Sequence, residues 1–230
     1  MATDPRRADW ILVPGTLCTG AVFDPLLDAL GVPRDRRRVV PLTQPDVRDY
    51  RAALTDAAEG AVFCGFSLGA IVLAHLADLL PASRILLFGL NPHADDPAKA
   101  EGRHALFRDV AATGGAAAMA ARPPDLRGPR AGPARSAILE MAEATATDIK
   151  AQTALALGRP GALPALSRAT APILVLTGGE DRQAPPALGR AAADAAPRGY
   201  FVELPGLGHY ALLEDPAACA AAVATWKDPA

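Results

Sequence analysis

The chain has 230 residues, of which 50% are hydrophobic and 21% are charged, and its formal net charge is −2. This length is enough to bury a substantial core, and the composition is typical of a globular, enzyme-sized domain. The charge is near neutral and no Lys/Arg stripe is interleaved with aromatic residues, which argues against nucleic acid and anionic membrane surfaces as partners.

The N-terminal residues and the cysteines give expectations about the cellular setting. Residues 1–9 are polar and charged, without the apolar segment of a signal peptide, and no apolar stretch is long enough to span a bilayer. Cys18, Cys64 and Cys219 are widely spaced, which predicts reduced thiols rather than a disulfide framework or a zinc site. We therefore expect a cytoplasmic protein whose partner is a small molecule.

Short apolar runs predict six strands separated by helices. The strands are apolar throughout rather than alternating, which is typical of a parallel sheet covered on both faces. Pro41 places the second strand near an edge of that sheet. Strands are expected at residues 10–13, 38–42, 62–66, 84–90, 172–177 and 200–204, and helices at 22–30, 46–58, 68–80, 186–196 and 215–226.

Residues 91–170 interrupt this alternation, because they contain no convincing strand. Helices are expected near 98–111, 115–122 and 133–157, separated by proline- and glycine-containing breaks. Ile138, Met141, Thr145 and Ile149 recur at helical spacing, so one face of the last helix should be apolar. That face either packs on the sheet domain or partly covers a pocket.

The segment Gly65-Phe66-Ser67-Leu68-Gly69 joins the third strand to an apolar helix. A serine on such a sharp turn is held in a strained conformation with its hydroxyl above the sheet, and the small residues around it let neighbouring backbone pass close by. The N–H groups at the start of the helix can stabilise a developing negative charge.

Three other predicted strands are followed by residues that suit nucleophilic catalysis by a serine. The first is followed by Pro14–Cys18, the fifth by Gly178–Asp181 and the sixth by Pro205–His209. Ligands of parallel sheets collect at the carboxyl ends of the strands. A serine nucleophile needs an imidazole to accept its proton and a carboxylate to orient that imidazole. The backbone N–H of Leu68 and that of Thr16, or failing that Leu17, are the expected oxyanion donors.

On these motifs the chain resembles the α/β-hydrolase superfamily, in particular its small, cofactor-free, esterase-like members. The resemblance implies Ser67 as nucleophile, His209 as base and Asp181 as acid, and the spacing to Pro185 favours Asp181 over Glu180. It also implies a core domain formed by residues 1–91 and 171–230, with a helical cap inserted at 92–170. The family's leading antiparallel strands have no counterpart here, so we expect about six strands, all parallel, with helices on both faces.

The resemblance implies no cofactor, and no His/Cys/Asp/Glu cluster in the sequence has the spacing of metal ligands. Pro14 stands where the family commonly has histidine before the glycine of the first loop; the backbone donor is kept but a supporting side chain is lost. The candidates for substrate contact are five side chains near the motifs or on the apolar cap face: Leu17, Cys18, Phe66, Met141 and Tyr210.

The predicted function is a serine hydrolase that cleaves a small ester or related acyl substrate through a covalent acyl-enzyme. The fold supports many chemistries, so thioesterase or lactonase action, carbon–carbon bond hydrolysis and a lyase reaction with the same triad stay open. A ligand-binding receptor that keeps the pocket without turnover is the alternative outside the enzyme class. The cap arginines, Arg103 among them, are candidates for binding a substrate carboxylate, although solvated surface charge is their usual role.

Overall fold

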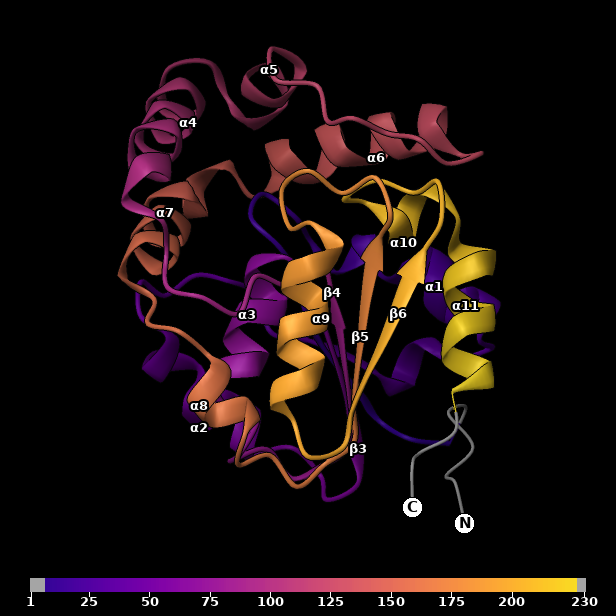
Figure 1. Ribbon diagram of the computed structural model, residues 1–230. Coiled ribbons are helices and arrows are strands. Elements are labelled where there is room, and N and C mark those ends of the chain that lie inside the picture. The colour runs from indigo at the N-terminus through magenta and orange to yellow at the C-terminus, as the bar shows by residue number, and fades with distance from the viewer. Residues whose placement is uncertain (1–6, 227–230) are drawn as a thin grey trace.

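In the computed structural model, which describes residues 7–226, a six-stranded parallel sheet forms the centre of the molecule (Figure 1). The strand order is β2-β1-β3-β4-β5-β6, with every neighbouring pair parallel. The predicted all-parallel sheet is therefore confirmed, and β2 lies at an edge as Pro41 indicated. The strands are β1 (Trp10–Val13), β2 (Arg37–Val39), β3 (Ala61–Phe66), β4 (Ala82–Phe88), β5 (Ile173–Gly178) and β6 (Gly199–Leu204).

Helices cover both faces of the sheet, because successive strand side chains point to opposite sides. Ile11 and Val13 of β1 belong to one buried apolar cluster, whereas Trp10 and Leu12 belong to a second. The first face carries α2 (Arg51–Thr55), α3 (Leu68–His75), α8 (Leu163–Leu166) and α9 (Pro186–Ala195), and the second carries α1 (Asp24–Ala29), α10 (Ala211–Glu214) and α11 (Pro216–Thr225) (Figure 1).

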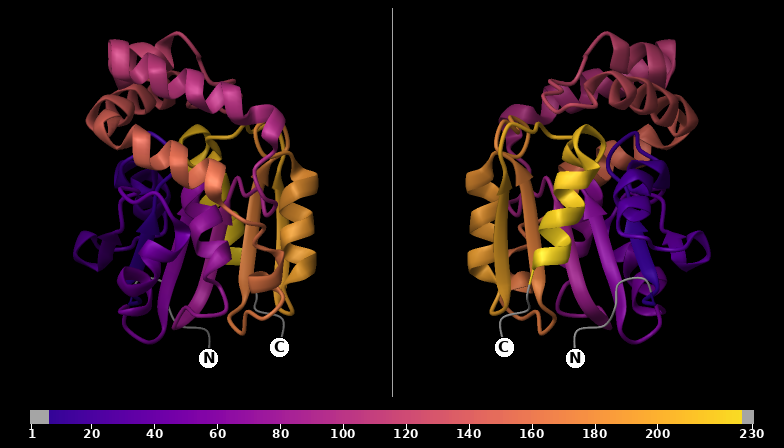
Figure 2. Two further views of the ribbon diagram at one scale, coloured as in Figure 1. Left: turned by 90° about the vertical axis from the view of Figure 1, so that its left-hand side faces the viewer. Right: turned by 90° about the vertical axis from the view of Figure 1, so that its right-hand side faces the viewer.

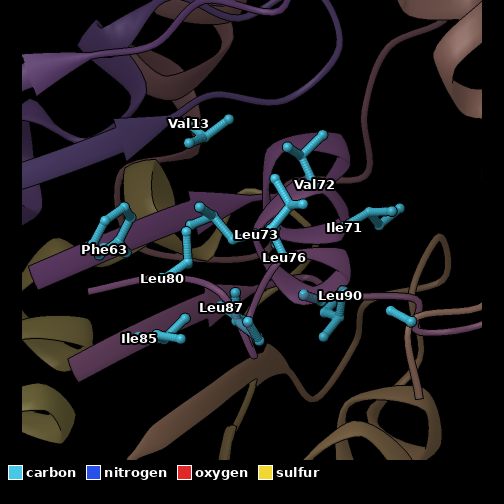
Figure 3. Packing of buried hydrophobic residues seen from close by; sticks show 14 of the residues in the cluster. Val13, Phe63, Ile71, Val72, Leu73, Leu76, Leu80, Ile85, Leu87 and Leu90 are labelled. Carbon is cyan, nitrogen blue, oxygen red and sulfur yellow. The ribbon is translucent and has the colours of Figure 1, made fainter. Parts of the chain in front are cut away.

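The helix α3 is buried over almost its whole length. All its residues except His75 are buried, and Leu73 packs among side chains from β1, β3 and β4 (Figure 3). Burial on all sides explains why its sequence is apolar without an amphipathic pattern. The helix is thereby fixed against the strands that carry the site.

Four helices arch over the carboxyl ends of the strands and form a cap (Figures 1 and 2). They are α4 (Ala100–Thr113), α5 (Gly115–Ala120), α6 (Ala131–Ala144) and α7 (Ile149–Gly158). The apolar face of α6 packs on the sheet domain, since Ile138 and Met141 belong to the cluster of the second sheet face. The helix α8 lies within the segment expected to form the cap, yet it packs with α3 and α9 on the first sheet face.

The single helix predicted at 133–157 is wrong. The chain leaves α6 at Ala144, makes a short 3-10 turn η5 (Ala146–Asp148) and continues as α7. Ile138 and Met141 are buried against the sheet domain, whereas Ile149 is buried in a separate cluster inside the cap. One straight helix could not bury both sets of side chains, so the tertiary packing imposes the break.

Other predicted elements are shorter than expected. The helix predicted at 68–80 ends at His75, whose imidazole nitrogens lie 2.7 Å from the Ile71 carbonyl and 2.5 Å from the Pro160 carbonyl. The helix predicted at 46–58 is the 3-10 turn η3 (Val47–Tyr50) followed by α2. The remaining 3-10 turns are η1 (Gly20–Val22), η2 (Arg34–Arg36) and η4 (Pro97–Lys99).

The turn between β3 and α3 depends on two glycines. A Cβ added to Gly69 would lie 2.0 Å from the Val13 carbonyl oxygen, and one added to Gly65 would lie 2.6 Å from the Ala70 Cα. Both contacts are with backbone, which cannot move aside without displacing β1 or α3. These two positions therefore exclude any side chain.

We predict that Gly69→Ala destabilises the protein by at least about 3 kcal/mol, because overpacking against backbone has no cheap relief. Gly102→Ala is the matched control: it lies in α4 with open space around its Cα, and helix propensity predicts a change between zero and about 1 kcal/mol in the stabilising direction. Urea unfolding measures both. Equal stability of the Gly69→Ala variant and the parent protein would contradict the close approach.

Candidate active site

Ser67 stands between β3 and α3 in a backbone conformation that non-glycine residues rarely adopt. Its φ is 51° and its ψ is −117°. Its N–H donates to the Phe88 carbonyl of β4 at 2.8 Å, which ties the turn to the neighbouring strand. Strained residues of this kind persist where the surrounding packing determines them, and they concentrate at functional sites.

The three residues predicted to cooperate are in contact. The Ser67 hydroxyl lies 3.0 Å from Nε2 of His209, and Nδ1 of His209 lies 2.7 Å from Oδ2 of Asp181. The second carboxylate oxygen of Asp181 accepts hydrogen bonds from the N–H groups of Gln183 (2.8 Å) and Ala184 (2.9 Å). With Nδ1–H donated to Asp181, Nε2 is free to accept the serine proton. Side chains from the ends of β3, β5 and β6 thus form one hydrogen-bonded chain.

Glu180, the neighbour of the proposed acid, takes no part in this chain. It is exposed, and its backbone N–H donates to the Leu207 carbonyl at 2.9 Å. Asp181 is 3% exposed and holds the imidazole. The geometry therefore favours Asp181 for the same position that the spacing to Pro185 indicated.

The two backbone N–H groups of the loop after β1 that were expected as oxyanion donors differ in their hydrogen bonding. The N–H of Leu17, the second choice for an oxyanion donor, donates to Oε1 of Gln152 at 2.9 Å. The N–H of Thr16 has no hydrogen-bond partner among residues 7–226, and Thr16 lines a pocket together with Ser67 and Leu68. Thr16 and Leu68 are therefore the backbone donors best placed for a charge developing next to Ser67.

The pocket beside Ser67 encloses about 460 Å³ of atom-free space, part of it open to solvent. The part of this space that a ligand could fill is about 80 Å³, which is smaller than typical small-molecule sites of roughly 300–1,000 Å³. The sheet domain and the cap both contribute to its walls. The lining residues are Thr16, Ser67, Leu68, Ile71, Gly89, Asn91, Lys99, Arg103, Arg159, Gln183, Ala184 and His209.

The five side chains expected to contact substrate do not line this pocket. They are buried in the apolar clusters: Leu17, Cys18, Phe66, Met141 and Tyr210. The nearness of a residue to a motif does not decide which side of a loop faces the ligand, and here these side chains point into the packing around the site. Burial also raises the pKa of Cys18 to about 12, so its thiol is protonated at neutral pH.

Two of those side chains pack around the histidine. The Phe66 ring lies 5.1 Å from the His209 ring, and the Tyr210 ring lies 5.6 Å from it, edge to face. Rings in these orientations make favourable contacts and exclude water from the imidazole edge. Their place in the site is support of His209.

Comparison with known proteins decides the family. The sequence profile described as the alpha/beta hydrolase family matches residues 7–222. The chain belongs to the alpha/beta hydrolase family. The resemblance inferred from its motifs is thereby confirmed.

Solved structures of other alpha/beta hydrolases share the fold. An esterase from Thermogutta terrifontis, solved with malate bound, is 23% identical, with a TM-score of 0.74 over 95% of this chain and 89% of that one. The enol-lactonase of Burkholderia xenovorans LB400 is 21% identical, with a TM-score of 0.77 over 95% and 90%. Likeness at this level of identity establishes the fold alone.

A curated relative matches more closely over a short segment. The protein provisionally named non-heme bromoperoxidase BpoC of Mycobacterium tuberculosis is 43% identical over 56 residues. The match covers 24% of the present chain and 21% of the length of the relative.

The described residues were also compared with the requirements for a membrane-spanning helix and for a metal site. None of the helices within residues 7–226 combines the length and the apolar character needed to cross a bilayer. Over the same residues, no group of three or more His, Cys, Asp or Glu side chains is arranged to hold a metal ion.

Sequence reasoning missed two buried polar residues that hold the site together. Gln152 of α7 is 1% exposed; its Oε1 accepts from the Leu17 N–H, and its Nε2 donates to the Leu42 carbonyl at 3.3 Å. Glu214 is fully buried, and its Oε2 accepts from the N–H groups of Arg127 (2.7 Å), Gly128 (3.0 Å) and Gly208 (2.9 Å).

Gln152 connects the cap to the loop after β1, and Glu214 connects it to the loop after β6. Gln152 holds the loop with the expected oxyanion donor, and Glu214 holds the residue before His209. A polar residue within an apolar helical segment is the only sequence signal for either of them.

We predict that Gln152→Leu lowers the free energy of unfolding by about 2–4 kcal/mol, because it leaves the Leu17 N–H and the Leu42 carbonyl buried without partners. The control is Thr153→Val, a change at the next buried position of α7 that removes neither bond. Denaturant unfolding compares the two variants. A loss of stability in Thr153→Val equal to that in Gln152→Leu would mean that packing of α7, and not the two hydrogen bonds, sets the cost.

Proposed function

We propose that the protein is a serine hydrolase that cleaves a small ester or related acyl substrate through a covalent acyl-enzyme. The observation that carries this proposal is the chain from the Ser67 hydroxyl through His209 to Asp181, at 3.0 and 2.7 Å. Membership of the alpha/beta hydrolase family supports hydrolysis in general. An esterase and an enol-lactonase among the structural neighbours are consistent with acyl chemistry.

In the first half of the reaction, Ser67 Oγ attacks the carbonyl carbon of the substrate while His209 Nε2 takes its proton. The carbonyl oxygen becomes negative and accepts hydrogen bonds from the N–H groups of Thr16 and Leu68. The imidazolium of His209 then donates its proton to the leaving oxygen as the carbon–oxygen bond breaks, which leaves an acyl group on Ser67.

In the second half, a water molecule takes the place of the leaving group. His209 accepts a proton from the water, whose oxygen attacks the acyl carbon, and the proton then passes to Ser67 Oγ as the acid product leaves. Asp181 keeps the imidazole oriented throughout and stabilises its positive charge. The same residues serve a lactone, whose leaving oxygen stays attached to the product.

We predict that Ser67→Ala and His209→Ala each lower kcat by about 10⁴- to 10⁶-fold, and that the double variant is little slower than either single one, because the members of a triad act as a unit. The measurement is hydrolysis of 4-nitrophenyl esters of increasing chain length, together with labelling by a fluorophosphonate probe, which reacts with activated serines. Ser67→Ala should abolish labelling.

The carboxylates provide a matched pair for the same assay. Asp181→Asn should reduce kcat by orders of magnitude because the histidine loses its orienting acceptor, whereas Glu180→Gln should leave activity unchanged. A parent protein that binds a small molecule tightly but neither labels nor hydrolyses any ester would point instead to a receptor.

The pH dependence follows from the role of His209. The imidazole must be neutral to accept the Ser67 proton, so kcat/KM for a neutral ester should fall as pH is lowered, approaching about tenfold per pH unit on the acid side. The control is circular dichroism at each pH, which separates loss of the base from unfolding. A rate that stays flat from mildly acidic to mildly basic pH, with chemistry limiting, would contradict His209 as the base.

A further inference from the structure

Three basic side chains line the pocket that contains Ser67 and His209. Lys99 ends the turn η4, Arg103 lies in α4 and Arg159 follows α7, so all three come from the cap side of the pocket. None of the described residues that line the pocket is an aspartate or a glutamate. A molecule bound next to Ser67 is therefore exposed to an excess of positive charge.

One carboxylate beside the pocket offsets part of this charge. Oδ1 of Asp95 accepts from Arg103 at 2.5 Å and from Arg159 at 2.9 Å, and Oδ2 accepts from Nε of Arg103 at 2.7 Å. Burial acts to raise the pKa of Asp95, but the two guanidinium groups hold it below its usual value, so the carboxylate is ionised at neutral pH. Three cations and one carboxylate leave a net charge of +2 at this end of the pocket.

The guanidinium of Arg159 is buried beside the pocket. Its side chain is 2% exposed, and a buried guanidinium costs free energy unless its donors are paired. One NH2 group donates to the Ala156 carbonyl at 2.6 Å and the other to Asp95, but its Nε–H has no acceptor among the described residues. Arg159 therefore supports Asp95, and its Nε–H is a buried donor that a ligand in the adjoining pocket could satisfy.

We propose that Lys99, Arg103 and Arg159 form a subsite for a carboxylate on the substrate. The substrates would then be anionic esters or lactones that carry a carboxylate a few bonds from the carbonyl that Ser67 attacks. This inference rests on the proposed hydrolase function for its turnover step and specifies the substrate class. Asp95 and Ala156 already engage most of the guanidinium donors, and those left for a substrate carboxylate are Nη1 of Arg103 and Nε of Arg159, together with the Lys99 ammonium. Charge-assisted bonds of this kind are the strongest hydrogen bonds available.

The first test compares matched pairs of substrates. For a charge on the acyl side, 4-nitrophenyl hemiglutarate is compared with 4-nitrophenyl valerate, which has the same chain length without the carboxylate. For a charge on the alcohol side, 4-acetoxybutyrate is compared with butyl acetate. In at least one pair we expect kcat/KM for the anion to be at least about 10-fold higher, and to lose this advantage as salt is raised from about 0.05 to about 0.5 M through screening.

The second test changes the charge. Arg103→Gln and Lys99→Gln should each lower the ratio of anionic to neutral kcat/KM, by about 10- to 100-fold for Arg103→Gln, the range for loss of a hydrogen bond to a charged group. Arg108→Gln is the matched control, because Arg108 lies in the same helix, is exposed and pairs with Glu101 away from the pocket. It should leave the ratio unchanged. Because Arg103→Gln leaves Asp95 with one partner fewer, Asp95→Asn/Arg103→Gln provides a second variant if the single one does not fold.

The third test separates the subsite from the reaction. Isothermal titration of glutarate into the parent protein should show saturable binding that Arg103→Gln weakens and Arg108→Gln does not. Serine labelling and hydrolysis of neutral esters without a preference for anions, and without glutarate binding, would overturn the subsite and leave the hydrolase function intact. Glutarate binding that depends on Arg103, in a protein that neither labels nor hydrolyses esters, would overturn the function and support the subsite.

Discussion

The close contact between β1 and the start of α3 is the constraint on which the rest of the site depends. The chain reverses direction at Ser67, and Gly69 then passes so near the Val13 carbonyl that only a hydrogen fits on its Cα. Because Val13 leads directly into the loop that contains Thr16, the same contact sets the separation between Ser67 and Thr16, the proposed nucleophile and oxyanion donor. The packing at the end of β1 thus determines how the groups of the site are positioned relative to one another.

The cap belongs to this geometry as well. Leu17 inserts its side chain into the cap's apolar cluster while its N–H is held by Gln152, whereas the Thr16 N–H has no hydrogen-bond partner within residues 7–226. Glu214 connects the segment before α6 to Gly208, next to His209. Two buried polar side chains therefore couple the position of the cap to both loops. A displacement of the cap would also move Thr16 and His209.

The sheet domain and the cap contribute different groups to the site. The parallel sheet brings the ends of β3, β5 and β6 together, and with them Ser67, Asp181 and His209, the proposed catalytic groups. The cap segment contributes Lys99, Arg103 and Arg159 to the lining of the same pocket. A proposed reaction centre on rigid strands, with the proposed carboxylate subsite on inserted helices, is consistent with one fold serving many substrates.

The sequence by itself determined the features that depend on residues close together in the chain. Continuous apolar strands predicted the parallel sheet, and Gly65-Phe66-Ser67-Leu68-Gly69 predicted the turn. Since the carboxyl ends of parallel strands meet at one edge, the order of strands and motifs along the chain was enough to group Ser67, Asp181 and His209.

Only the tertiary structure decided which side chains face the pocket. Met141 and Leu17 were candidates for substrate contact but are buried in apolar clusters, and the predicted helix 133–157 breaks because its side chains enter two of those clusters. Gln152 meets the backbone of Leu17, 135 residues away, and Arg159 meets Asp95. Such pairings are set by how helices and loops pack, and local sequence patterns carry no record of them.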